Sequence, residues 1–196
     1  MTHKALCSLA VKWLRYPNSR GGHGCQIAVS EISSGFTGER PDAIGFRTGS
    51  GKDEGSVVVE VKTSRSDFLA DFKKPHRSDT GLGTWRYYLA PEGVIGADEL
   101  PDRWGLIHTY GKSRLKLVRG PFQTTNYFER EQLLSDMRHD SDFNRERFIL
   151  ARLLGRVGDV EAANSKFKAV YRERDELAKK LAAMRKEIRR LRTGPP

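Results

Sequence analysis

The sequence predicts an α/β fold: a mixed sheet flanked by helices, followed by a C-terminal helical and coiled-coil segment. Short β-branched and aromatic runs fill the first two thirds of the chain and are interrupted by two helical patterns. Gly and Pro are frequent in that part and become rare after Asn126. We therefore expect an α/β domain over 1–125, a helical connector over 126–156 and a coiled coil over 157–193.

The α/β part begins with an amphipathic helix over 4–15, which ends at the Pro and Gly residues that follow it. Three strands are predicted next, over 25–32, 41–47 and 56–62. A short helix over 66–74 ends before Pro75. Further strands follow over 85–90, 105–110 and 114–118, the last two forming a hairpin. This order of elements favours a single mixed sheet.

The last segment carries apolar residues at alternating spacings of three and four, which is typical of a coiled coil. These seam positions are Val160, Ala163, Phe167, Val170, Leu177, Leu181, Met184, Ile188 and Leu191. Arg174 is the one polar residue among them. We expect the seam to form a homodimer, with its orientation open. The alternative is a long amphipathic helix that packs on its own domain.

The composition indicates a polyanionic partner. A net charge of +10 and a pI of about 9.8 favour nucleic acid, although a merely soluble basic protein and a membrane surface remain alternatives. The sequence has no apolar run long enough to span a membrane. Two cysteines make no disulfide framework, and no Cys/His pair has the spacing of a zinc site. We therefore expect a reduced, cytoplasmic protein.

The strand over 56–62 carries the chemistry. Its valines alternate with Glu60 and Lys62, which stand ~7 Å apart on one face of the strand. Charged groups in such an apolar run are costly unless they are paired, solvated or functional. If the strand after Pro41 is an antiparallel neighbour, Asp42 and Glu60 can converge on one hard cation such as Mg²⁺. The alternatives are a turn-forming Asp42 and a solvent-facing Glu60–Lys62 pair.

The spacing Pro41-Asp42, 17 residues, Glu60-Val61-Lys62 resembles the signature of the PD-(D/E)XK nuclease superfamily. The stretch from Val59 to Lys74 is similar to that of MmcB-type DNA-repair endonucleases, in which a Glu-x-Lys strand runs into a Ser-x-x-Asp-Phe-x-x-Asp-x-Lys helix. The similarity covers roughly residues 4 to 120 and includes the Gly-Leu-Ile strand at 105–107. The polar insert at 78–84 departs from the pattern of this family.

The resemblance implies a magnesium site, which Mn²⁺ can also fill. Asp42 and Glu60 would bind the ion with the backbone carbonyl of Val61, and Lys62 would polarise the attacking water. Glu31 matches the extra acidic ligand of many family members. It could equally be a plain surface residue.

Basic residues flank the expected site and suit contacts with phosphate. They are Arg65, Lys73, Lys74 and Arg77. The sequence thus predicts a Mg²⁺-dependent endonuclease that hydrolyses DNA phosphodiester bonds, in DNA repair or in a phage or defence context. The alternative is a catalytically silent nuclease-fold protein that binds DNA or acts as an adaptor or inhibitor through its coiled coil. The intact Asp42, Glu60 and Lys62 set favours the enzyme.

Overall fold

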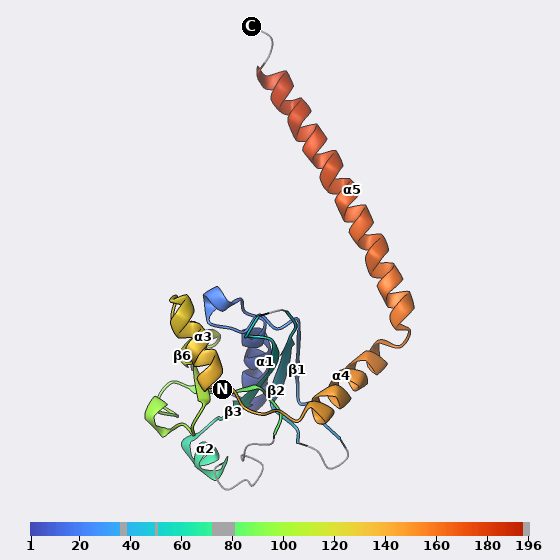
Figure 1. The fold of residues 1–196 in the computed structure, drawn as a ribbon. Coiled ribbons are helices and arrows are strands. Elements are labelled where there is room, and N and C mark those ends of the chain that lie inside the picture. Colours follow the sequence, from blue (N-terminus) through green and yellow to red (C-terminus); the bar gives the residue numbers. More distant parts are fainter. Residues whose placement is uncertain (36–38, 50, 72–80, 194–196) are drawn as a thin grey trace. The chain divides into compact units, whose positions relative to one another are not determined.

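The computed structural model describes the chain except for residues 36–38, 50, 72–80 and 194–196 (Figure 1). Two compact units make up the protein, Met1–Leu150 and Ala151–Pro196. The first unit contains the whole sheet, and the second contains the longest helix.

A single six-stranded sheet forms the centre of the first unit, and its strands lie side by side in chain order. The strands are β1 (Ile27–Ser30), β2 (Ala43–Arg47), β3 (Gly55–Val61), β4 (Trp85–Pro91), β5 (Trp104–Tyr110) and β6 (Arg114–Arg119). The β3–β4 and β4–β5 pairs are parallel, and the other three pairs are antiparallel. The mixed α/β sheet predicted from the sequence, and the order of its elements, are confirmed.

Helix α1 (His3–Leu14) packs on one face of the sheet (Figure 1). The Thr2 hydroxyl accepts a hydrogen bond from the amide of Ala5, which fixes the first turn. Its buried side chains recur at helical spacing. They are Leu6, Cys7, Ala10, Trp13 and Leu14. The alternate valines of β3 face them. Burial of this apolar stripe is the main reason why the segment is a stable helix.

Helix α2 (Arg65–Asp71) belongs to the opposite face of the sheet. Its Phe68 is fully buried and meets the ring of Tyr88 edge to face. Tyr88 in turn stacks on Trp104 at a centroid distance of 4.5 Å. The parallel β3–β4 pair needs a crossover connection, and α2 lies in that connection.

Helix α3 (Tyr127–Asp136) and the first part of α4 (Phe143–Val157) also belong to the first unit. The indole of Trp85 donates to the carbonyl of Leu134, which lies in the core on the α1 side. In α4, the buried carboxylate of Glu146 accepts hydrogen bonds from the Ser56 hydroxyl and the Gly83 amide. These contacts attach α4 to the starts of β3 and β4. The described residues also form short 3-10 helices, η1 (Asn18–Arg20), η3 (Ala97–Glu99) and η4 (Pro121–Gln123).

His23 lies inside an aromatic cluster of the first unit. Its imidazole is fully buried, and Nε2 is 2.7 Å from the Tyr87 hydroxyl. The rings of Trp13, Trp85 and Phe122 also surround it. Burial, helped by the positive charge of Arg47, lowers the pKa of His23 to about 3. The imidazole is therefore neutral at ordinary pH.

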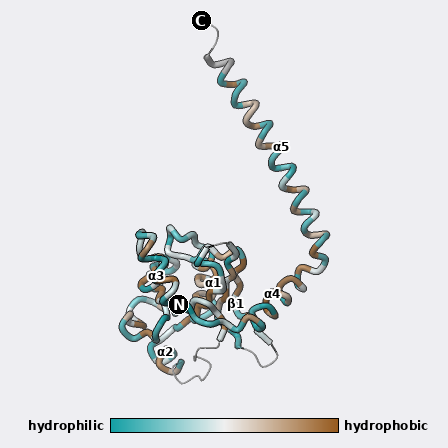
Figure 2. Tube along the Cα trace, viewed as in Figure 1, coloured by the Kyte–Doolittle hydropathy of each residue, from teal (hydrophilic) through white to brown (hydrophobic). Residues whose placement is uncertain are grey.

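The second unit holds α5 (Val160–Thr193), a helix of 34 residues. Figure 2 shows it as mostly hydrophilic, with isolated apolar residues along its length. The large seam side chains that the structure describes are exposed, from Phe167 at 62% to Val160 at 45%. No helix in the described residues is long and apolar enough to cross a membrane.

Candidate active site

The expected site residues come from the ends of adjacent strands. Strands β2 and β3 are antiparallel, and Ala43 pairs with Val59. Extending this register by one residue sets Asp42 opposite Glu60. The antiparallel neighbourhood on which the sequence argument depended is therefore present.

Asp42 occupies the bend immediately before β2. One carboxylate oxygen, Oδ2, accepts a hydrogen bond of 2.8 Å from the amide of Val61. The other, Oδ1, lies 3.1 Å from Nε2 of His3 at the start of α1. About 19% of the Asp42 side chain stays exposed. Asp42 is thus fixed between the end of β3 and the first turn of α1.

Glu31 stands beside Asp42 because β1 and β2 are paired. Its amide donates to the carbonyl of Asp42 over 3.2 Å, and Arg40 contacts both its carbonyl and its carboxylate. The backbone of Glu31 has a φ of 52°, a left-handed conformation that costs a non-glycine residue on the order of 1–3 kcal/mol. Strain of this kind occurs more often at functional sites than elsewhere.

Glu60 and Lys62 are both buried, at 7% and 3% exposure. The interpretation of these residues as a solvent-facing pair is therefore wrong. Val61 lies in the core on the α1 side, so its two neighbours face the α2 side of the sheet. There, Nζ of Lys62 donates to Oδ1 of Asp71 at 2.9 Å, and the Tyr88 hydroxyl donates to Oδ2 of the same carboxylate at 2.8 Å.

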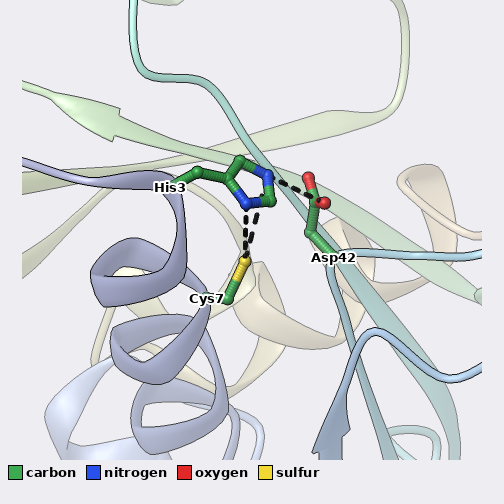
Figure 3. Close-up of side chains that lie close together, drawn as sticks. All are labelled: His3, Cys7 and Asp42. Carbon is green, nitrogen blue, oxygen red and sulfur yellow. Dashed lines mark hydrogen bonds and ion pairs between the residues drawn. The ribbon is translucent and has the colours of Figure 1, made fainter.

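Cys7 is the residue of this neighbourhood that sequence reasoning missed. Its Sγ lies 3.5 Å from Nδ1 of His3, one helical turn earlier, and the His3 ring lies between Cys7 and Asp42 (Figure 3). From the sequence we expected no Cys/His pair with the spacing of a zinc site, and the structure brings His3 and Cys7 together on α1. The spacing i, i+4 puts two side chains on one face of a helix. The expected helix over 4–15 begins next to His3, so the sequence already indicated that His3 and Cys7 could share a face.

The surroundings of the Cys7 thiol raise its pKa. Burial raises it most, and the charges of Asp42, Glu31 and Glu60 raise it further, to about 12. Glu31 lies beside Asp42 across the β1–β2 pair, and Asp42 is in register with Glu60 across the β2–β3 pair.

The expected phosphate-binding residues are only partly described. Arg65 forms a bidentate pair with Glu99, and this pair, with the Gly96 amide, lowers the pKa of Glu99 to about 2. Both partners remain partly exposed. Lys73, Lys74 and Arg77 lie outside the described residues.

The acidic residues at these strand ends offer ligand types that suit a hard cation. Glu31, Asp42 and Glu60 offer anionic oxygens, which Mg²⁺ prefers. Asp42 and Glu31 keep 19% and 47% of their side chains exposed, so an ion can reach them from solvent. The ammonium group of Lys62 is paired with Asp71 on the α2 side.

The chain is an α/β protein in which Asp42 and Glu60 stand in register at adjacent ends of β2 and β3. No protein-family model matches the chain, and no curated protein matches it either. Among solved structures, the chain is similar to a protein of unknown function, SPO1766 from Silicibacter pomeroyi. The two are 22% identical, the similarity covers 82% of this chain and 94% of that one, and the TM-score is 0.46.

Proposed function

We propose that the protein is a Mg²⁺-dependent nuclease that hydrolyses DNA phosphodiester bonds. The observation that supports this proposal is the antiparallel pairing of β2 and β3, which sets Asp42 opposite Glu60, while Glu31 lies beside Asp42 across the β1–β2 pair. These residues follow one another along the chain in the order that the PD-(D/E)XK resemblance implies. The net charge of +10 supports a nucleic acid as the substrate.

Each residue has a role in this proposal. Asp42 and Glu60 would hold Mg²⁺ with the backbone carbonyl of Val61, and Glu31 would add a further oxygen. The ion, when bound, would polarise the scissile phosphate and lower the pKa of a bound water. The hydrogen bond from the Val61 amide keeps the Asp42 carboxylate against β3. Fixing a ligand before the ion arrives reduces the cost of assembling the site.

One observation favours the alternative, a nuclease fold that binds DNA without cutting it. The ammonium group of Lys62 is neutralised by Asp71, and only 4% and 0% of the two side chains are exposed. A lysine held in this way does not reach an attacking water unless the pair opens. The Lys62–Asp71 pair is therefore the feature that separates the two proposals.

A plasmid-cleavage assay tests the proposal. The protein should nick or cut supercoiled DNA with Mg²⁺ or Mn²⁺, and EDTA should stop the reaction. Asp42→Asn and Glu60→Gln should each abolish cleavage, whereas Glu92→Gln, at an exposed position after β4, should not. DNA binding without cleavage by the wild-type protein supports the silent alternative. Cleavage that survives either site substitution removes that residue from the site.

Glu31 allows a separate test of the ligand set. Glycine accepts the left-handed conformation of this residue at no steric cost, so Glu31→Gly should leave the fold at least as stable as before. Cleavage at limiting Mg²⁺ should nevertheless fall, because one carboxylate is lost. Unchanged cleavage at every Mg²⁺ concentration would assign Glu31 a structural role only.

We further propose that α5 pairs two copies of the chain as an antiparallel coiled coil. The charge distribution along α5 supports a second copy of the chain as the partner, and it supports the antiparallel orientation. Residues 178–193 contain seven basic groups and one acidic group, a net charge of +6, whereas residues 160–177 contain four of each. A parallel pair would set the two basic ends side by side. An antiparallel pair sets each basic end against a neutral half, which reduces repulsion.

A further inference from the structure

We propose that His3, Cys7 and Asp42 form a second metal site, which binds a borderline-soft divalent cation such as Zn²⁺. The three residues come from the first turns of α1 and from the bend before β2 (Figure 3). Their ligand atoms, one nitrogen, one sulfur and one oxygen, all lie within 4.8 Å of one another. This site does not depend on the proposed nuclease activity.

The distances between the ligand atoms suit tetrahedral coordination. Zinc bonds of about 2.3 Å to sulfur and about 2.0 Å to nitrogen or oxygen give tetrahedral edges of about 3.5 Å for S···N and about 3.3 Å for N···O. Sγ of Cys7 lies 3.9 Å from Nε2 of His3, and that nitrogen lies 3.1 Å from Oδ1 of Asp42. Both separations differ from the tetrahedral edges by a few tenths of an ångström. The fourth position would be left to water.

This site shares Asp42 with the proposed magnesium site, but its other ligands are of different types. Mg²⁺ takes oxygen ligands almost exclusively, whereas thiolate and imidazole select zinc and its transition-metal neighbours. Binding would convert the Cys7 thiol to a thiolate, with its proton released to solvent. The charge of the cation would offset the negative charge of the neighbouring carboxylates.

The burial of the three side chains determines how an ion would enter, and it argues against a role of Cys7 as a catalytic nucleophile. The His3 side chain is 45% exposed and Asp42 is 19% exposed, so a small ion has a path from solvent. Cys7, which lies beneath them, is only 2% exposed. A Cys–His–Asp arrangement is also known in nucleophilic catalysis, but such a thiol must reach a substrate carbonyl. A single metal ion is small enough to reach Cys7, whereas an acyl substrate is too large.

Zinc binding to the full chain, prepared without a histidine tag, tests this site. Metal-free protein is titrated with Zn²⁺ in competition with a chromophoric chelator, and Co²⁺ serves as a spectroscopic probe. The wild type should bind one equivalent of Zn²⁺ at this site. His3→Ala and Cys7→Ala should each weaken binding at least about tenfold, since even outer residues of metal sites contribute that much. Cys25→Ala is the matched control, because Cys25 is the other buried free cysteine of the same core.

The Co²⁺ spectrum identifies the sulfur ligand. Thiolate-to-cobalt charge-transfer absorption should appear in the wild type and in Cys25→Ala, and disappear in Cys7→Ala. Three results overturn the site: no Zn²⁺ binding by the wild type, equal affinity in the wild type and His3→Ala, or thiolate absorption that persists without Cys7. His3 is half exposed, so His3→Ala keeps the test decisive even if the Cys7 variant folds poorly.

Discussion

Nζ of Lys62 lies 2.9 Å from Oδ1 of Asp71, and both side chains are buried between β3 and α2. Two charges in a dry environment stabilise each other only as a pair, and the loss of one leaves the other uncompensated. The Tyr88 hydroxyl completes the arrangement by donating to the second oxygen of Asp71. Lys62 therefore contributes to the stability of the fold as well as being a candidate for catalysis.

We predict that Asp71→Asn destabilises the protein by about 3–5 kcal/mol, because the Lys62 ammonium would then be buried without a counter-charge. Adding Lys62→Met should recover part of this loss, since no charge would remain to be buried. Urea unfolding of the wild type, both single variants and the double variant measures the coupling. If the losses of unfolding free energy in the two single variants add up in the double variant, the pair contributes no interaction of its own.

His23 should make stability depend on pH. Its pKa in the folded state is about 3, below its ordinary value of 6.5, so the unfolded chain takes up a proton first as the pH falls. The contribution is fully present above pH 6.5 and is lost between pH 6.5 and 3, by about 1.4 kcal/mol for each pH unit. His23→Gln keeps a polar partner for Tyr87 but cannot titrate in this range. Free energies of unfolding measured at several pH values should therefore fall less steeply in this variant. Equal slopes in the two proteins would contradict the assignment.

DNA affinity should fall steeply with salt, because contacts between basic side chains and phosphates release counterions. Lys73→Glu with Lys74→Glu should weaken binding and lower the slope of log affinity against log salt by about 2. Lys112→Glu with Lys116→Glu changes the charge equally in and beside the β5–β6 hairpin and serves as the control. Filter-binding measurements of DNA affinity at several salt concentrations test this prediction. If the control pair weakens DNA binding more, the DNA-binding surface does not include Lys73 and Lys74.

The seam of α5 should decide the oligomeric state. Leu181→Lys places a charge in the seam and should convert the dimer to a monomer in sedimentation experiments. Ala183→Lys adds the same charge on an outer face of the helix and should leave the dimer intact. Arg174→Leu should tighten the dimer, because it replaces the one polar residue of the seam. A monomeric wild type would reject α5 as the dimerisation element.

Much of the sheet could be predicted because its strands carry strong local signals. The valine run of β3 and the spacing from Asp42 to Glu60 were sufficient to predict two neighbouring strands with acidic residues at their ends. The partner of Lys62 was harder to predict, since it depends on which face α2 buries. A signal was present, because Asp71 follows the buried Phe68 by three residues and therefore shares its face.

Other features depend on contacts between distant parts of the chain. Nothing local marks Glu31 as left-handed, because glutamate is not a residue that favours this conformation. His23 looked unremarkable between two glycines, and only the fold surrounds it with aromatic rings. The sequence already indicated that His3 and Cys7 share one helix, but Asp42 joins them from the bend before β2, 35 residues after Cys7.

The three tryptophans of the chain, Trp13, Trp85 and Trp104, are all buried in the first unit, whereas α5 contains none. Indole emission therefore reports on the sheet and its core alone. Far-ultraviolet circular dichroism, by contrast, is sensitive to the 34 residues of α5 as well. Melting curves recorded by the two optical signals need not coincide, and the gap between them would measure how independently the long helix loses its structure.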